Sequence, residues 1–299
     1  MQRILVTGAN SFVGRHLIPF LVNSGHKVQG TVRKVDVARK GAFAPKTFYH
    51  PNLIGDLSDR TFLKSLRWKP DVIIHLAANS DVNANVSRIF NDNVTSAENL
   101  LKFAKRVGCS KLIAISTISV HGDILHQSVS ESTGFVKPNI YGVTKRAAEI
   151  LFQSDTNLAS KYIVRLPAVL GFGASKHWIS RVFLSATKNK EIEIHNPSSL
   201  FNNVIYIHDL LRFLDQLISR SDEGAFAFPI ASTKPLEIKS IVDLIIKHSN
   251  SNSKVLVSKK ITKAFTIDDR YARENFSYNS LSVSSAIKNY IGDSILSLE

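Results

Sequence analysis

The sequence is poor in cysteine and in acidic residues, and it has no long apolar run. A single cysteine, Cys109, among 299 residues excludes a disulfide scaffold and a zinc site built from cysteine. It also fits a reducing compartment, so we expect a cytoplasmic protein. The apolar runs fall short of the roughly 20 residues that a membrane span needs, so no integral membrane segment is expected. A strand-like stretch begins almost at Met1, so no signal peptide is expected either.

Acidic residues are outnumbered, with 24 Asp+Glu against 38 Lys+Arg, and the formal net charge is +14. Such an excess indicates an acidic partner: nucleic acid, an anionic membrane surface or phosphorylated small molecules. Nucleic-acid binding requires a basic face interleaved with exposed aromatic residues, whereas these cations are spread along the chain. We therefore expect no nucleic-acid partner. Residues 1–66 hold ten Lys+Arg against three acids, which is half of the excess.

The first 167 residues alternate strand-like and helix-like patterns, which is typical of a parallel sheet covered by helices. The alternation predicts an α/β fold with a Rossmann-type doubly wound parallel sheet. The expected strands are 3–6, 27–32, 48–50, 71–76, 111–116 and 161–166, and the expected helices are 12–23, 58–66 (opened by a Ser58 cap), 84–107 and 141–153.

The alternation loosens after residue 167. Helices are expected near 179–187 and 236–248, a strand running into a helix over 204–218, a strand over 254–257, and only weak patterns from 258 onward. We predict a dinucleotide-binding domain over 1–167, to which parts of 203–232 return. The prediction for 168–299 is a smaller mixed α/β C-terminal lobe that binds the substrate.

A glycine-containing turn, Thr7 to Gly14, follows the first strand. Gly8 permits a tight turn, and Gly14 lets the helix pack closely on the strand. The free N–H groups of the helix that begins at Phe12 and Val13 then point at a pyrophosphate. Ser11 stands where a second glycine is commoner, and its hydroxyl can itself meet a phosphate. The alternative is an ordinary strand-turn-helix corner.

Several further motifs follow this turn in order, and together they carry a specific resemblance. The sequence resembles the extended short-chain dehydrogenase/reductase family, in the branch of nucleotide-sugar epimerases, dehydratases and reductases, from residue 3 to about 215. The resemblance implies a nucleotide-sugar substrate, an adenine contact from Asp56 and a cofactor site that includes Leu57, Leu76, Ala77 and Ala78; a homodimer is compatible with it. The motifs are Thr7–Gly14, Gly55–Leu57, His75–Ala78, Asn93–Leu101, Ser116–Gly122, Tyr141–Lys145 and Tyr206–Leu210.

Tyr141 and Lys145 are one helical turn apart on one face of the expected helix. A nearby ammonium is expected to lower the phenol pKa towards neutrality, which makes Tyr141 a proton donor or acceptor during hydride transfer. The resemblance implies that Lys145 also holds the nicotinamide ribose. It implies too that Thr117 supplies the hydroxyl that orients the substrate oxygen. The alternative is a surface Tyr and Lys on an amphipathic helix.

The two positions after Thr117 separate reaction types within the resemblance. Sugar 4,6-dehydratases have Asp and Glu there, which carry out the elimination, whereas this sequence has Ile118 and Ser119. We therefore set the dehydratase aside in favour of hexosamine-nucleotide 4-reductases and related epimerases. The ten histidines are scattered without paired carboxylates, so no metal site is expected.

The end of the second strand bears on the cofactor. NAD-preferring members place an acid there to bind the adenosine ribose, but this sequence has Val32 followed by Arg33 and Lys34. Arg33 can stack on adenine and pair with a 2′-phosphate, and Lys34 adds a second charge. We predict NADP(H), with NAD(H) left open and with two exposed surface cations as the alternative interpretation.

The substrate side departs from the resemblance. Ala168 stands where related epimerases have Asn, and Asn202 and Asn203 stand where relatives place a diphosphate-binding Arg. Nearby cations that either supply the missing charge or form a solvated face are Lys176, Arg181, Lys188 and Lys190.

These observations predict an NADP(H)-dependent oxidoreductase. It would reduce the 4-keto group of a UDP- or dTDP-linked 6-deoxy hexose or hexosamine for surface polysaccharide precursor synthesis. The alternatives are an NAD-dependent nucleotide-sugar 4-epimerase, a non-catalytic NADP-binding regulator and a simple carbonyl reductase.

Overall fold

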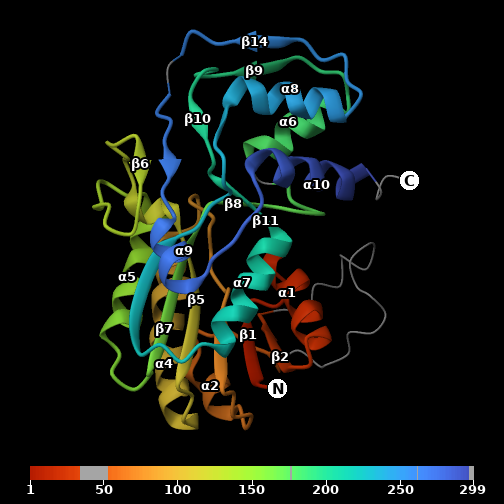
Figure 1. The fold of residues 1–299 in the computed structure, drawn as a ribbon. Coiled ribbons are helices and arrows are strands. Elements are labelled where there is room, and N and C mark those ends of the chain that lie inside the picture. Colours follow the sequence, from red (N-terminus) through yellow and green to blue (C-terminus); the bar gives the residue numbers. More distant parts are fainter. Residues whose placement is uncertain (34–52, 176, 261, 296–299) are drawn as a thin grey trace. The chain divides into compact units, whose positions relative to one another are not determined.

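The computed structural model describes residues 1–33, 53–175, 177–260 and 262–295. The chain forms two compact units, coloured along the sequence in Figure 1. Unit 1 comprises Met1–Asp123, Phe135–Arg165 and Leu214–Ala227, and unit 2 comprises Ile124–Gly134, Leu166–Phe213 and Phe228–Glu299.

Unit 1 is built on a seven-stranded sheet in the order β12-β7-β5-β4-β1-β2-β3. The pairs β3·β2, β2·β1, β1·β4 and β4·β5 are parallel. Strand order reverses at β1, so the α/β, Rossmann-type doubly wound fold is confirmed. The strands are β1 (Arg3–Thr7), β2 (Lys27–Val32), β3 (Leu53–Ile54), β4 (Val72–His75), β5 (Lys111–Thr117), β7 (Ser160–Leu166) and β12 (Gly224–Pro229).

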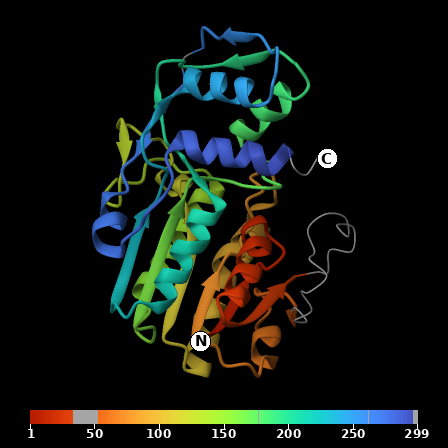
Figure 2. The same ribbon diagram turned by 45° about the vertical axis from the view of Figure 1, so that its right-hand side comes forward.

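Helices cover both faces of this sheet, because crossovers of one hand run in opposite directions from β1. Figure 2 shows the strands between these helices. The helices are α1 (Phe12–Asn23), α2 (Arg60–Ser65), α3 (Val86–Phe90), α4 (Ser96–Val107) and α5 (Ile140–Ser154), and α7 (Ile207–Ser219) continues from unit 2 into unit 1.

Capping residues set the ends of these helices. Ser11 caps α1, which has the predicted bounds, and Gly108 ends α4 with a φ of 71°. The prediction that Ser58 opens the next helix is wrong. Asp59 caps α2 instead, because its carboxylate accepts a hydrogen bond from the Thr61 N–H at 2.8 Å.

The helix predicted over 84–107 is not a single α-helix. A π-helical turn, η2 (Asn91–Thr95), separates α3 from α4. Within this turn Asn93 is buried, and its side chain bonds to Asn79 and Thr144. The widened turn brings polar side chains into the interior, a feature that apolar periodicity does not encode.

Unit 2 packs short strand pairs against helices. Its aromatic core includes Phe213, Phe228, Phe276 and Tyr278, with Phe228 and Phe276 stacked at 4.7 Å between ring centroids. The elements are β6 (Ser128–Val129), β8 (Ala168–Leu170), α6 (Trp178–Ala186), β9 (Ile192–Ile194), β10 (Leu200–Phe201), β11 (Val204–Tyr206), β13 (Leu236–Glu237), α8 (Ile238–His248), β14 (Val255–Val257), β15 (Thr266–Ile267), α9 (Arg270–Phe276) and α10 (Val283–Ile295).

The strand predicted over 48–50 lies outside the described residues, as does Lys34. The weakly patterned region from 258 holds two helices, α9 and α10, that the sequence analysis did not place. Among the described residues, none of the helices combines the length and apolar character that crossing a membrane requires.

Candidate functional site

The turn after β1 has the close backbone approaches that its glycines predict. Gly8 adopts a φ of +71°, and a Cβ there would lie 2.8 Å from the backbone nitrogen of Ala77. A Cβ on Gly14 would lie 2.6 Å from the carbonyl oxygen of Gly8. Only glycine fits both positions. The Ser11 hydroxyl caps α1 by accepting a hydrogen bond from the Gly14 N–H at 3.1 Å.

A cavity of about 140 Å³ lies within unit 1 where β1, β2 and β4 end. Phe12, Val13 and Gly14 lie in the first turn of α1 and are not among its lining residues, and neither are Tyr141 and Lys145. The structure brings eight of the predicted cofactor residues together here: Gly8, Ser11, Arg33, Asp56, Leu57, Leu76, Ala77 and Ala78. Asn10, Thr31, Gly55, Asn79, Asp92 and Ser96 complete the lining.

The Asp56 loop is fixed by side-chain hydrogen bonds. One carboxylate oxygen, Oδ1, accepts from the backbone N–H and the hydroxyl of Ser58, at 2.9 and 2.8 Å. Asn99 on α4 donates to the backbone carbonyls of Leu57 and Ser58, at 3.1 and 2.9 Å. Asn99 was not among the predicted site residues, although it falls within the Asn93–Leu101 motif. Its amide holds the loop against α4.

Arg33 is not a solitary surface cation. Its Nη1 donates to Asp92 Oδ1 at 2.8 Å, and both residues line the cavity. Val32, in the position expected to hold an acid, is buried. Sequence reasoning did not find Asp92, because no motif marks it.

Thr117 and Tyr141 are positioned by two elements that touch. Thr117 ends β5, and its hydroxyl oxygen accepts from the Ser119 N–H at 3.2 Å to start the 3-10 turn η3 (Ile118–His121). Tyr141 is in the first turn of α5, which Asn139 caps. A Cβ on Gly142 would lie 2.3 Å from the Ser119 carbonyl oxygen, so the helix rests directly on the η3 turn.

Lys145 is buried, and its Nζ donates to the carbonyl oxygen of Ile115 on β5 at 2.7 Å. Burial lowers the pKa of Lys145 to about 8, although the negative charge of Glu149 raises it in part. Burial also raises the pKa of Tyr141 to about 12. The expected lowering of the Tyr141 pKa by Lys145 is therefore wrong for this structure, because loss of hydration dominates.

A buried ion pair joins α5 to the sheet. Glu149, one turn after Lys145 on α5, pairs with Arg165 on β7 at 3.0 Å and also with Arg146 at 2.9 Å. It accepts a hydrogen bond from the Ser116 hydroxyl next to Thr117. The network joins α5, β5 and β7. A glutamate four residues after Lys145, on the same helix face, is the signal by which it can be found.

The two asparagines on the substrate side have different surroundings within unit 2. Asn202 is buried and bonds to Ile267 through both ends of its amide, at 2.8 and 2.7 Å. Its role is to hold β15. The buried Oδ1 of Asn203 has no hydrogen-bond partner among the described residues, and Asn203 lines a second cavity.

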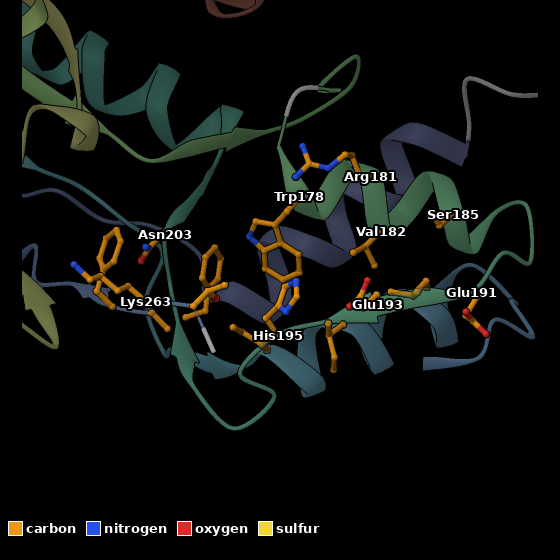
Figure 3. Close-up of a pocket in the computed structure, with 16 residues that line it drawn as sticks. Trp178, Arg181, Val182, Ser185, Glu191, Glu193, His195, Asn203 and Lys263 are labelled. Carbon is orange, nitrogen blue, oxygen red and sulfur yellow. The ribbon is translucent and has the colours of Figure 1, made fainter. Parts of the chain in front are cut away.

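This second cavity has a volume of about 490 Å³ and lies entirely within unit 2. Figure 3 shows Trp178, His195, Asn203 and Lys263 among the side chains around it. The Trp178 and Phe201 rings meet edge to face at 5.1 Å. Of the four predicted substrate-side cations, Arg181 lines it, Lys188 and Lys190 do not, and Lys176 lies outside the described residues. The remaining lining residues are Val182, Ser185, Glu191, Ile192, Glu193, Ile194, Ile238, Thr262, Ala264 and Phe265.

Metal chemistry finds no support in the described part of the chain. Across residues 1–33, 53–175, 177–260 and 262–295 there is no group of three or more His, Cys, Asp or Glu side chains placed to hold a metal ion.

Comparison with known proteins gives a consistent result. A model of the "NAD dependent epimerase/dehydratase family" matches residues 4–229. A UDP-glucose 4-epimerase of Halalkalibacterium halodurans is 32% identical over 154 residues, which span 50% of this chain and 45% of that relative. A GDP-6-deoxy-D-talose 4-dehydrogenase of Aggregatibacter actinomycetemcomitans is 29% identical over 75% of this chain and 72% of the relative.

Solved structures share the fold at lower sequence identity. The UDP-glucose 4-epimerase of Thermotoga maritima with UDP-glucose has a TM-score of 0.81 at 17% identity, covering 99% of this chain and 100% of that one. RMD from Pseudomonas aeruginosa complexed with NADPH has a TM-score of 0.77 at 19% identity, covering 98% of each chain.

Proposed function

The chain belongs to the NAD dependent epimerase/dehydratase family, and from this premise we propose that it is an NADP(H)-dependent reductase of nucleotide-linked sugars. The substrate is a UDP- or dTDP-linked 6-deoxy hexose or hexosamine, and its 4-keto group is reduced. The product would enter the synthesis of surface polysaccharide precursors in the cytoplasm. Unit 1 would bind the cofactor and unit 2 the nucleotide sugar.

The single observation that carries the cofactor preference is Arg33. It lines the unit 1 cavity, as do Asp56 and its ion-pair partner Asp92, and the residue before it is an apolar valine in place of an acid. A carboxylate at Val32 would bind the ribose hydroxyls of NAD and repel a 2′-phosphate. A guanidinium favours the phosphate. Lys34 would add a second positive charge.

The turn around Gly8 fits a dinucleotide pyrophosphate. Gly8 and Gly14 leave no room for a side chain, because the backbone at Ala77 and at Gly8 lies too close, and this packing would bring the start of α1 to the phosphates. The N–H groups at the start of α1 would bind the phosphates, with the first turn at Phe12 and Val13. Asp56, Leu57, Leu76, Ala77 and Ala78 would hold the adenosine side, and Lys145 the nicotinamide ribose.

Thr117 and Tyr141 would act on the substrate carbonyl. When bound, NADPH would supply a hydride to the carbonyl carbon. The Thr117 hydroxyl would hold the carbonyl oxygen, and the Tyr141 phenol would donate its proton to that oxygen as the alcohol forms. Tyr141 would then regain a proton from solvent, which balances the reduction.

The unit 2 cavity offers a place for the nucleotide of the substrate. Trp178, Phe201 and His195 present rings on which a base can stack. Arg181 and Lys263, which line the cavity together with Glu191 and Glu193, would contact the diphosphate. The buried Oδ1 of Asn203 can accept a hydrogen bond from a base N–H. These side chains would take over the recognition that relatives assign to Arg and Asn.

A homodimer is proposed through α3 and α5. Val86 and Phe90 on α3, and Val143 and Ile150 on α5, are 62%, 47%, 45% and 50% exposed. The two helices are neighbours in unit 1, so these side chains offer an apolar area for a second copy. Light scattering on the purified protein measures the assembly directly.

The second candidate is the NAD-dependent 4-epimerase. It is favoured by the identity with the Halalkalibacterium halodurans protein, which is the highest among the relatives compared above. A non-catalytic NADP-binding regulator is disfavoured, because a sensor does not need Thr117, Tyr141 and Lys145 together.

The test is turnover with NADPH and NADH on a panel of UDP- and dTDP-linked 4-keto sugars, followed by cofactor absorbance. We expect NADPH to be oxidised with at least one of them, faster than NADH. Use of NADH about tenfold better than NADPH would contradict the cofactor assignment. Interconversion of UDP-hexoses without net cofactor oxidation would establish the epimerase instead.

A further inference from the structure

Asp92 and Arg33 form an ion pair at the cofactor cavity, and the two residues come from different elements. Arg33 follows β2, and Asp92 belongs to the π-helical turn η2. The Arg33 side chain is 47% exposed, whereas that of Asp92 is only 9% exposed. The carboxylate is therefore the more enclosed member of the pair and the guanidinium the more exposed one, and both residues line the cavity.

The Asp92 carboxylate is itself held in place. Its Oδ2 accepts a hydrogen bond from Asn79 Nδ2 at 2.8 Å, while Oδ1 accepts from Arg33. The Asn79 backbone N–H donates to Asn93 Oδ1 at 2.7 Å, and Asn93 Nδ2 donates to the Thr144 hydroxyl at 2.9 Å. Thr144 precedes Lys145 on α5. A continuous hydrogen-bond network thus runs from Arg33 to the helix that carries Tyr141 and Lys145.

The geometry of the guanidinium decides what this pair can do. Arginine has five N–H donors in a planar fork, and Asp92 takes one of them, on Nη1. The remaining donors on Nε and Nη2 can form a two-pronged contact with a phosphate. A long side chain that is already ordered loses less conformational entropy when the phosphate binds.

We infer that Asp92 is a positioning residue that fixes Arg33 for the 2′-phosphate of NADP. The inference rests on the proposed NADP(H) preference and extends it to a residue that no motif marks. Asp92 does not contact the phosphate in this account; it acts through Arg33. The π-helical turn has a function as well, because it directs Asp92 and Asn93 into the same network.

The test uses two ligands that differ only in the 2′-phosphate. Binding of 2′-phospho-ADP-ribose and of ADP-ribose to the full chain is measured by calorimetry, which needs no substrate. We expect Asp92→Asn to weaken the 2′-phosphorylated ligand about fivefold, the difference between a charge-assisted and a neutral hydrogen bond to Arg33. ADP-ribose affinity should stay within about twofold and reports that the variant is folded. Unchanged or tighter binding of the 2′-phosphorylated ligand would overturn the inference, and tighter binding would mean that Asp92 competes with the phosphate for Arg33.

Arg88→Gln is the matched control. Arg88 lies 3.9 Å from Asp92 Oδ2, is 66% exposed and does not line the cavity. The Arg88→Gln substitution removes a charge beside the same carboxylate. We expect it to leave the ratio of the affinities for 2′-phospho-ADP-ribose and ADP-ribose unchanged. Arg88→Gln removes a positive charge and Asp92→Asn a negative one, so a general charge effect would move the two affinities in opposite directions. A loss equal to that of Asp92→Asn would instead show a disturbance of the α3–η2 segment and would overturn the positioning role.

The double variant separates this inference from the proposed function. If Asp92 acts through Arg33, Asp92→Asn has no further effect on the affinity ratio in an Arg33→Ala background. An unchanged ratio in Arg33→Ala alone would contradict the cofactor preference itself. If Arg33→Ala loses the preference for the 2′-phosphorylated ligand and Asp92→Asn keeps it, only the role of Asp92 is overturned.

Discussion

The buried ammonium group of Lys145 donates a hydrogen bond to the carbonyl oxygen of Ile115 at 2.7 Å, and this bond links α5 to β5. The charge is held where hydration is lost, and burial lowers the Lys145 pKa from 10.5 to about 8. His75, buried on β4, is kept neutral near this charge, because burial and Lys145 together lower its pKa to about 3. Burying this charge costs stability, a cost expected of a residue that is proposed to bind a ligand.

Lys145→Met should therefore raise the stability of the cofactor-free protein near pH 7 while abolishing turnover. Below about pH 8 the ammonium is charged in both the folded and the unfolded state, so the fold bears the full penalty of burying it. Between about pH 8 and 10.5 the unfolded chain binds more protons than the folded protein, and the wild type gains stability as the pH rises. The advantage of Lys145→Met should shrink over that window.

Urea unfolding at about pH 7 and at about pH 10 measures this difference. Lys102→Met is the control, because Lys102 is half exposed on α4 and pairs with the exposed Glu98. It should change stability by less than about 0.5 kcal/mol at either pH. A destabilised Lys145→Met protein near pH 7 would contradict the penalty.

Tyr141→Phe should remove nearly all turnover and leave cofactor binding intact, because only the proton donor is lost. Tyr162→Phe removes a phenol that donates to Asp222 at 2.8 Å, away from the residues assigned to catalysis. It should keep the wild-type kcat. Stopped-flow reduction rates compare the two, and substantial activity in Tyr141→Phe would refute its role.

Gly8→Ala and Gly108→Ala separate backbone strain from steric exclusion. Both glycines have a φ of +71°, but only at Gly8 would the new Cβ meet another group, the Ala77 nitrogen at 2.8 Å. Gly108→Ala should lower the free energy of unfolding by about 1 kcal/mol, the strain of a left-handed residue, and leave cofactor affinity unchanged. Gly8→Ala should cost more and weaken ADP-ribose binding. Equal effects of the two variants on ADP-ribose affinity would argue against the turn as the phosphate cradle.

Asn202→Ala should lower stability, whereas Asn203→Ala should weaken substrate binding. Loss of the Asn202 amide leaves the buried Ile267 N–H and carbonyl unpaired, so the free energy of unfolding should fall by about 2 kcal/mol. Asn203→Ala should leave stability nearly unchanged and raise the KM for the nucleotide sugar. Thermal unfolding and steady-state kinetics separate them. A wild-type KM in Asn203→Ala would remove the unit 2 cavity from the substrate site.

Local signals predicted the elements whose ends are set by neighbouring residues. The bounds of α1 are as predicted: the Ser11 side chain caps its start, and it ends at Ser24, before Gly25 with a φ of +84°. By contrast, α10 was not predicted, because its serines and Gly292 obscure the pattern. Its buried residues do follow helical spacing: Val283, Ala286, Ile287, Tyr290 and Ile291.

The candidate site was predictable as far as motifs reach and no further. Gly8, Asp56 and Ala77 are far apart in sequence, yet the order of motifs was enough to group them, and the structure gathers them at one cavity. Asp92 and Glu149 were not found, because their importance comes from partners that only the fold brings near, Arg33 and Arg165. The raised pKa of Tyr141 is a property of burial, which the spacing of Tyr141 and Lys145 does not reveal.

The charged residues that line each cavity are of both signs. Arg33 lines the unit 1 cavity together with Asp56 and Asp92, while Lys34, Arg39, Lys40 and Lys46 lie outside the described residues. Arg181 and Lys263 line the unit 2 cavity together with Glu191 and Glu193.

Hydride transfer from NADPH to the substrate is the central claim, and deuterium labelling tests it most directly. The protein is incubated with NADPH deuterated at the transferable position and a dTDP- or UDP-linked 4-keto sugar, and the product is examined by mass spectrometry. We predict one deuterium at C4 of the product for each NADPH oxidised. A product without deuterium, formed with no net oxidation of NADPH, would contradict the reductase.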